Sequence, residues 1–115
     1  MIRIKKRKGC CIFSFDCDEL NKKSVATIQE HAQTLPITTK IGLNFENIER
    51  VDESFFEFVK TQATGRISAI ISPKTSMLTY FSLRKTINLT PVYLGMEDFL
   101  ANRRQIIKRD FKLVS

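Results

Sequence analysis

Two carboxylates and a hydroxyl, carried by Asp52, Glu53 and Ser54, stand side by side between two hydrophobic segments. In residues 41–45, before them, apolar and polar residues alternate, which predicts a half-buried strand. After them the apolar residues recur at helical spacing, so the three polar residues are expected at the start of a helix. Aspartate and serine both cap helices well, because their oxygens accept hydrogen bonds from free backbone N–H groups. Ser54 and Glu57 also fit the capping-box pattern.

The stretch IGLNFENIERVDESFF, residues 41–56, resembles the STAS domain family, which is typified by bacterial anti-sigma factor antagonists. Members carry a strand of the type LVLDLSGVTFID followed by Ser-Ser-Gly-Leu at a helix start, and this stretch lies on that pattern without a gap. ISAIISP resembles the family's next strand, and TPVYLGMEDFLA resembles its closing strand and helix. The resemblance extends over residues 2–101 and implies a single STAS-like domain for the whole chain, residues 1–115.

The resemblance implies a function as well. By this resemblance the chain is expected to be a non-enzymatic, partner-switching regulatory module. It would bind a protein partner, a serine kinase or anti-sigma factor, through the start of the Ser54 helix. Ser54 falls on the residue that is phosphorylated in the antagonists, so the resemblance makes it a phosphorylation candidate. Asn44, Glu53 and Phe55 depart from the family pattern, where Asp, Ser and Gly are usual. These departures bear on the phosphoswitch more than on the fold.

Electrostatics leaves three interpretations of Ser54 open. A phosphate there would meet free backbone amides and the positive end of the helix dipole, which favour its roughly two negative charges. Asp52 and Glu53 would repel the same phosphate. In the second interpretation Ser54 is never modified and is only a helix cap, contributing about 1 kcal/mol to stability. In the third interpretation Glu53 supplies a permanent negative charge, and the partner binds constitutively.

Three phenylalanines follow at positions 55, 56 and 58. The family register buries Phe56 and Val59, so either Phe55 or Phe58 is expected to be partly exposed beside Ser54, as a partner-binding aromatic. The alternative is a wide helix face buried under a neighbouring loop. The expected partner-binding residues are Asp52, Glu53, Ser54, Phe55 and Phe58.

The remaining pattern alternates strands and helices after an opening hairpin at residues 7–9. Strands are predicted at residues 1–5, 10–15, 41–45, 67–71 and 92–94, and helices at 21–35, 54–63, 75–87 and after Gly95. The predicted fold class is therefore α/β, a STAS-like mixed sheet of about four to five strands with about four helices packed on it. The near-continuous apolar run at 10–15 predicts burial on both faces. Residues 108–115 are expected to form a basic C-terminal extension, either a strand or an ordered tail.

Composition narrows the function classes. Hydrophobic residues make up 43% of the 115 positions and charged residues 27%, as in an ordinary globular domain. No apolar run approaches the roughly 20 residues that a membrane span needs, and no signal peptide is evident, so a cytoplasmic protein is expected. The three cysteines form no CxxC motif, and His31 is the only histidine, so no metal or other cofactor is expected. No phosphate loop or nucleophile elbow indicates an enzyme, and the acids at 16, 18 and 19 are expected to be solvated.

The formal net charge is +7, and the excess lies at the two ends of the chain. Such charge favours acidic partners, unless it is only a solvated rim. It supports a second hypothesis, a basic module that binds nucleic acid without sequence preference. A STAS-type accessory subunit of a transport complex is a further alternative. The clustered cations are Arg3, Lys5, Lys6, Arg7 and Lys8, and Arg103, Arg104, Lys108, Arg109 and Lys112.

Overall fold

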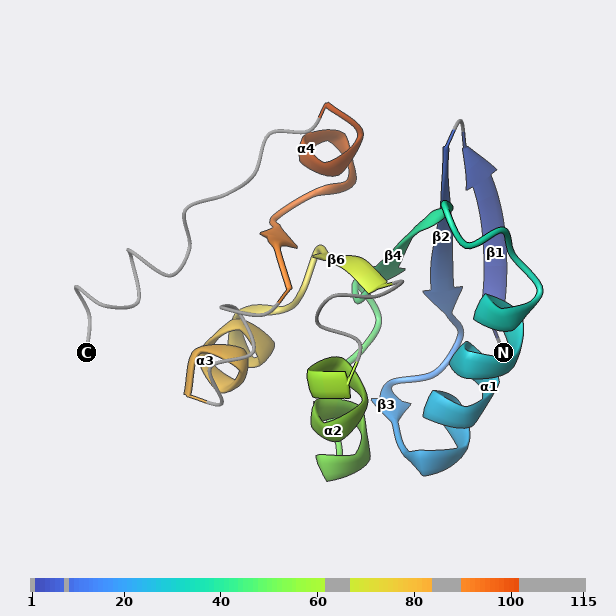
Figure 1. Cartoon of the computed structure of the whole chain (residues 1–115). Coiled ribbons are helices and arrows are strands. Elements are labelled where there is room, and N and C mark those ends of the chain that lie inside the picture. The colour runs from blue at the N-terminus through green and yellow to red at the C-terminus, as the bar shows by residue number, and fades with distance from the viewer. Residues whose placement is uncertain (1, 8, 62–66, 84–89, 102–115) are drawn as a thin grey trace.

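A computed structural model of the chain describes residues 2–7, 9–61, 67–83 and 90–101 (Figure 1). Strands and helices alternate along most of this chain, as the sequence predicts. The elements are β1 (Ile2–Arg7), β2 (Cys10–Phe15), β3 (Glu19–Leu20), α1 (Lys22–Gln33), β4 (Lys40–Asn44), β5 (Arg50–Val51), α2 (Glu53–Thr61), β6 (Ile67–Ile71), α3 (Thr75–Leu83), β7 (Val92–Tyr93) and α4 (Met96–Leu100).

The main sheet has five strands in the order β1-β2-β4-β6-β7. β1 runs antiparallel to β2, whereas β2, β4, β6 and β7 run parallel to one another. The β1–β2 hairpin turns through Gly9, whose φ of 77° is a left-handed conformation that glycine adopts without a steric penalty. The hairpin therefore places β1 at one end of the sheet, beside β2 alone.

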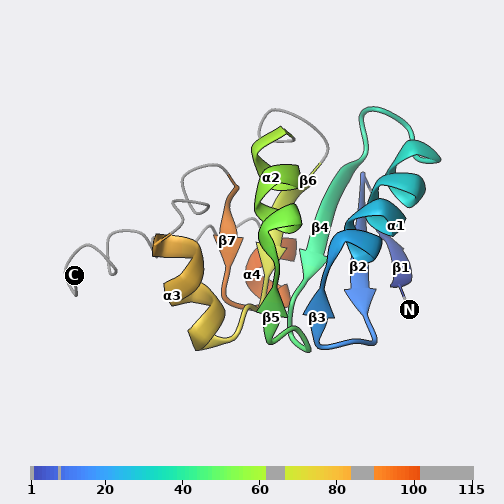
Figure 2. The same ribbon diagram turned by 90° about the horizontal axis from the view of Figure 1, so that it is seen from below.

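Helices cover both faces of this sheet unequally (Figures 1 and 2). α1, α2 and α3 lie on one face, where Phe13, Leu43 and Ile70 belong to the larger core. α4 lies on the other face, where Ile12, Ala69, Ile71 and Tyr93 pack with half-buried Met96 and Phe99. β2 contributes to both cores, so the predicted burial of residues 10–15 on both faces is confirmed.

Helix α1 shows how local sequence sets the limits of an element. The Asn21 side chain accepts the Ser24 N–H at 3.1 Å, and the Asn21 N–H donates to the Ser24 hydroxyl at 3.2 Å, which completes a capping box. The buried residues Val25, Ile28 and Ala32 form the predicted apolar stripe. The helix ends at Gln33, two residues earlier than predicted, where the Thr34 hydroxyl and N–H both donate to the His31 carbonyl oxygen.

A second, two-stranded sheet was not predicted. β3 and β5 pair in parallel, with Glu19 opposite Arg50 and Leu20 opposite Val51. The Asp52 N–H extends the pairing by donating to the Leu20 carbonyl oxygen at 3.0 Å. Strands of two residues are too short to show an alternating pattern, so the sequence indicates only turns here.

Several predictions concern residues outside the described part of the chain. These are the helix end at Thr64 and Gly65, the last turn of the helix predicted at 75–87, Arg103 and Arg104, and the basic extension at 108–115.

Candidate functional site

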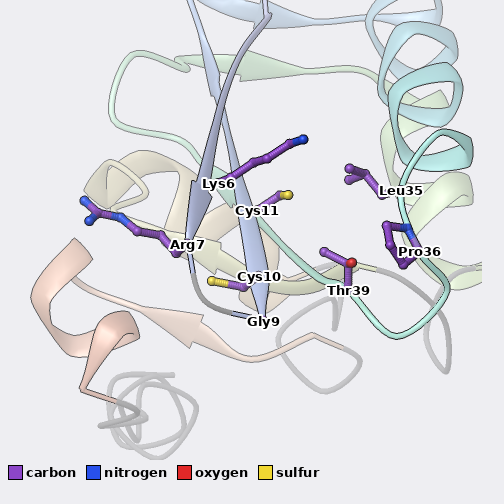
Figure 3. A pocket seen from close by; sticks show the side chains of 8 residues that line it. All are labelled: Lys6, Arg7, Gly9, Cys10, Cys11, Leu35, Pro36 and Thr39. Atoms are coloured by element: carbon purple, nitrogen blue, oxygen red, sulfur yellow. The ribbon is translucent and has the colours of Figure 1, made fainter.

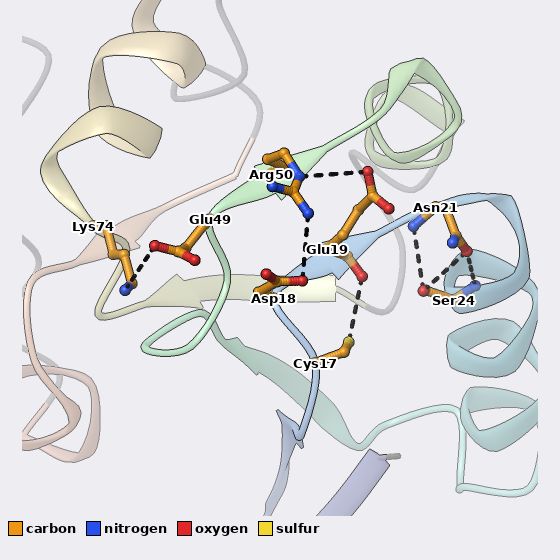
Figure 4. Close-up of polar contacts among 8 residues, drawn as sticks. All are labelled: Cys17, Asp18, Glu19, Asn21, Ser24, Glu49, Arg50 and Lys74. Atoms are coloured by element: carbon orange, nitrogen blue, oxygen red, sulfur yellow. Dashed lines mark hydrogen bonds and ion pairs between the residues drawn. The ribbon is translucent and has the colours of Figure 1, made fainter.

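The candidate site lies at the carboxyl ends of the parallel strands, where the segments that follow β2, β4 and β6 gather (Figure 4). Open sheets with parallel strands commonly bind ligands at this edge. Arg50 bridges two acids of the β2–β3 segment, with its guanidinium 3.6 Å from Asp18 and 3.7 Å from Glu19. Lys74, just before α3, lies 3.6 Å from the Glu49 carboxylate. These ion pairs tie the β4–β5 segment to its neighbours on both sides.

Asp52 caps helix α2. It immediately precedes the first helical residue, Glu53, and its carboxylate accepts the Ser54 N–H at 2.9 Å. The Ser54 hydroxyl donates to the same carboxylate oxygen. The Asp52 carbonyl oxygen also accepts the Phe55 N–H at 3.1 Å. One residue therefore satisfies two backbone donors and one side-chain donor at the helix start.

This geometry corrects the prediction that Ser54 caps the helix in a capping box with Glu57. Ser54 lies inside the first turn of α2, and the cap position belongs to Asp52. The physical reason is that an aspartate carboxylate accepts several hydrogen bonds at once and is favoured by the positive end of the helix dipole. The helix therefore begins two residues earlier than a cap at Ser54 would require.

The expectation of an exposed phenylalanine is wrong. Phe55 is 0% exposed and Phe58 is 5% exposed, so both are as buried as Phe56 and Val59. The ring of Phe55 lies 5.4 Å from that of Phe45 and 5.9 Å from that of Phe56. α2 lies between α1 and α3 over the sheet, so its apolar side is covered broadly (Figure 2). The alternative of a wide buried helix face is the one that the structure shows.

The exposed groups at the start of α2 are therefore carboxylates. Asp52 and Glu53 are exposed, and Ser54 beside them is half-buried. Glu49 and Glu57 are exposed on the same segment, where Arg50 is the only cation between residues 46 and 59. A chain of net charge +7 thus presents an acidic surface at this turn.

The residues that surround this turn were not predicted from the sequence as part of the site. Asp18, Glu19, Arg50 and Lys74 were not assigned to the site, and the first two were expected only as solvated loop acids. They are partly exposed but paired, and such surface pairs contribute about 0–1 kcal/mol each. Placing them together requires the order of the strands, which a run of acids does not reveal.

The other reactive groups are dispersed. Cys10, Cys11 and Cys17 carry free thiols, and no group of three or more His, Cys, Asp or Glu side chains among the described residues could hold a metal ion. His31 lies edge-on to Phe13, with 6.2 Å between ring centroids, on the flank of α1. In the described residues, no helix has the length and apolar character needed to cross a membrane.

Comparisons with known proteins identify the fold. No protein-family model and no curated protein matches the sequence. A solved anti-sigma factor antagonist (STAS) domain protein from Planctomyces limnophilus is 18% identical, with a TM-score of 0.72 over 88% of this chain and 95% of that one. The solved anti-sigma factor antagonist SpoIIAA, in its unphosphorylated form, is 20% identical, with a TM-score of 0.61 over 90% of this chain and 96% of that one. The chain therefore has the fold of a STAS domain, and the predicted fold class is confirmed.

Proposed function

We propose that this STAS-fold chain is a non-enzymatic, cytoplasmic regulatory module that binds a protein partner, of the serine-kinase or anti-sigma-factor type, through the start of α2. The fold supports a regulatory role, since one solved protein that shares it is an anti-sigma factor antagonist. The observation that carries the proposal is the exposed pair Asp52 and Glu53, held beside Ser54 at the edge where the loops gather.

The buried phenylalanines have a supporting part in this proposal. Phe55 and Phe58 lie in the core beneath the turn, so they fix the direction of α2 and do not meet the partner in this conformation. The partner meets the carboxylates of Asp52 and Glu53 and the neighbouring Arg50. A rigid helix start of this kind lowers the ordering cost of binding.

Phosphorylation of Ser54 is the proposed switch. The hydroxyl that would be phosphorylated now donates to Asp52, and a phosphate cannot make that bond. It would instead place about 1.5 to 2 negative charges next to two carboxylates, while competing with Asp52 for the backbone N–H groups of the first turn. Displacement of the Asp52 carboxylate would change the surface that the partner reads.

A capture experiment tests the proposal. The wild-type chain and the variants Ser54→Ala, Ser54→Asp and Thr38→Asp serve as baits in a lysate of the source cell, and bound proteins are identified by mass spectrometry. Thr38 is an exposed residue before β4, at the opposite end of the sheet, so Thr38→Asp controls for added charge. The expected result is one discrete protein held by wild type, Ser54→Ala and Thr38→Asp, and lost with Ser54→Asp.

Other outcomes have defined meanings. Equal capture by all four baits would show that Ser54 has only a structural role and would contradict the proposed switch. In that case Glu53→Ser decides whether a permanent charge at residue 53 holds the partner, since unchanged affinity would exclude that role. Recovery of nucleic-acid-dependent proteins alone, abolished by nuclease, would contradict the protein-binding function.

A further inference from the structure

The outer edge of β1 combines cations with an open backbone. β1 stands at the end of the sheet, and no described strand pairs with its outer side. In an antiparallel ladder every second residue directs its N–H and C=O away from the neighbouring strand. β1 spans six residues, so several backbone donors and acceptors line this edge. Such an edge is a template for one more strand.

The two faces of β1 differ in charge. Arg3, Lys5 and Arg7 are exposed on the α4 side of the sheet, since their partners in register are Ser14, Ile12 and Cys10. Lys40 adds a fourth exposed cation in the same row as Arg7 and Cys10. Arg3 pairs with Asp16 at 3.0 Å, but no described acid forms an ion pair with Lys5, Arg7 or Lys40.

The other face of β1 is partly apolar. Ile2 and Ile4 pack against the larger core yet stay half-buried. A hollow of about 200 Å³ lies at its Ile2 end, beside Thr27 of α1. A second, of about 240 Å³, lies at the other end, where Lys6 and Cys11 point toward Leu35 and Pro36 (Figure 3).

We propose that the outer edge of β1 receives an acidic, extended segment of a partner protein, which adds to the sheet as a sixth strand. Alternate side chains of a strand are about 6.8 Å apart on one face, so acids at every second position fall opposite Arg3, Lys5 and Arg7. The intervening apolar side chains of the segment lie beside Ile2 and Ile4 and over the two hollows. Main-chain hydrogen bonds supply affinity, and the charge pattern supplies selectivity.

The charges exclude a second copy of this chain as the occupant. Two β1 edges paired with each other would set cations against cations, and like charges directly opposite each other are destabilising. Nucleic acid would neutralise the cations but leave the backbone edge and the isoleucines unmatched. An alternating acidic and apolar strand satisfies all of these features.

Fluorescence anisotropy with a labelled peptide that alternates Glu and Val over the length of β1 tests the proposal. Lys5→Glu should weaken binding roughly tenfold, because an attractive cross-strand pair becomes a repulsive one. The matched control is Lys22→Glu, an exposed cation at the start of α1, which should change affinity less than about twofold. A peptide with Lys at the matching position should recover affinity for the Lys5→Glu variant.

Three further probes separate a paired strand from simple charge attraction. The same peptide with alternate backbone nitrogens methylated, a scrambled peptide of equal charge, and a single-stranded oligonucleotide of equal charge should each bind at least tenfold more weakly. Equal binding of the methylated or scrambled peptide, tighter binding of the oligonucleotide, or no binding of the alternating peptide would overturn the proposal. Ser54→Asp should leave peptide affinity unchanged, so failure here is independent of the function proposed for α2.

Discussion

The start of α2 and the outer edge of β1 are opposite in charge and in how their polar groups are satisfied. At α2, the Asp52 carboxylate already accepts hydrogen bonds from the N–H and the hydroxyl of Ser54, so these donors of the first turn are satisfied within the turn itself. At β1, Lys5 and Arg7 flank a backbone edge whose hydrogen bonds are not completed by any described strand. A closed network changes its surface only when a group is modified or displaced, whereas an open edge accepts a partner directly. The first arrangement suits a switch and the second suits a docking edge.

The largest expected effect tests whether the start of α2 is anchored in the core. Phe55→Ala should lower the free energy of unfolding by about 3–5 kcal/mol, since it removes a fully buried ring that packs on Phe45. Urea denaturation measures the loss, with Glu57→Ala as control, an exposed residue of the same helix that is expected to stay within about 0.5 kcal/mol of wild type. A loss below 1 kcal/mol for Phe55→Ala would show that the ring is not buried in the core. The start of α2 would then not be anchored in the core, contrary to the comparison drawn with β1.

A smaller effect is expected where α4 covers the sheet and leaves β1 uncovered. A Cβ at Gly42 would lie 2.8 Å from Ile71 Cδ1 and 3.2 Å from Phe99 Cζ. Gly42→Ala should therefore destabilise the chain by about 1–3 kcal/mol through overpacking. Combining it with Phe99→Leu should recover part of the loss, because Leu frees space at the ring position. An unchanged or increased melting temperature for Gly42→Ala would show that Phe99 is not held against this strand.

The cap should contribute less than either core contact. Asp52→Ala is expected to cost about 1 kcal/mol, because the Ser54 N–H loses its acceptor. Asp52→Asn should retain most of the stability, since the amide oxygen still caps the helix. Ser54→Ala should cost less than Asp52→Ala, and chemical denaturation of the three variants gives the ranking. The reverse order would restore Ser54 as the cap.

The smallest expected effect is on the stability of the β1 edge. Lys5→Glu should change the free energy of unfolding by no more than about 0.5 kcal/mol, since the side chain is exposed and has no described acid as an ion-pair partner. Thermal unfolding at low salt is the sensitive measurement. A stability loss of several kcal/mol would show that Lys5 helps to hold the fold together. The β1 edge would then not be a docking edge that is free of structural roles.

Sequence patterns predicted the elements that carry their own signal. Residues 10–15 and 67–71 are runs of β-branched, aromatic and small apolar residues, and both form strands with the predicted limits. Asn21, Val25 and Ile28 likewise place α1, although its capping box was not recognised. The helix start at residues 52–54 was predicted from its capping residues together with the helical spacing of the apolar residues that follow.

The features that failed depend on what lies next to them in space. The burial of Phe55 depends on contacts with other segments, such as the ring of Phe45, which the spacing within the helix does not report. The pairing of Glu19 with Arg50 depends on two segments far apart in the sequence. That no described strand pairs with the outer side of β1 follows from the strand order, so the basic run at residues 3–7 could be noticed in the sequence but not interpreted.

The most direct test of the proposed switch is the affinity of the captured partner for the chain phosphorylated at Ser54, measured against the chain phosphorylated at Thr38. In the proposed switch, phosphate on Ser54 would displace the Asp52 cap, whereas phosphate on Thr38 would lie at the opposite end of the sheet. We expect at least a tenfold loss of affinity for the first chain, roughly 1.4 kcal/mol, and none for the second. Equal affinities for the two chains would contradict the proposed switch.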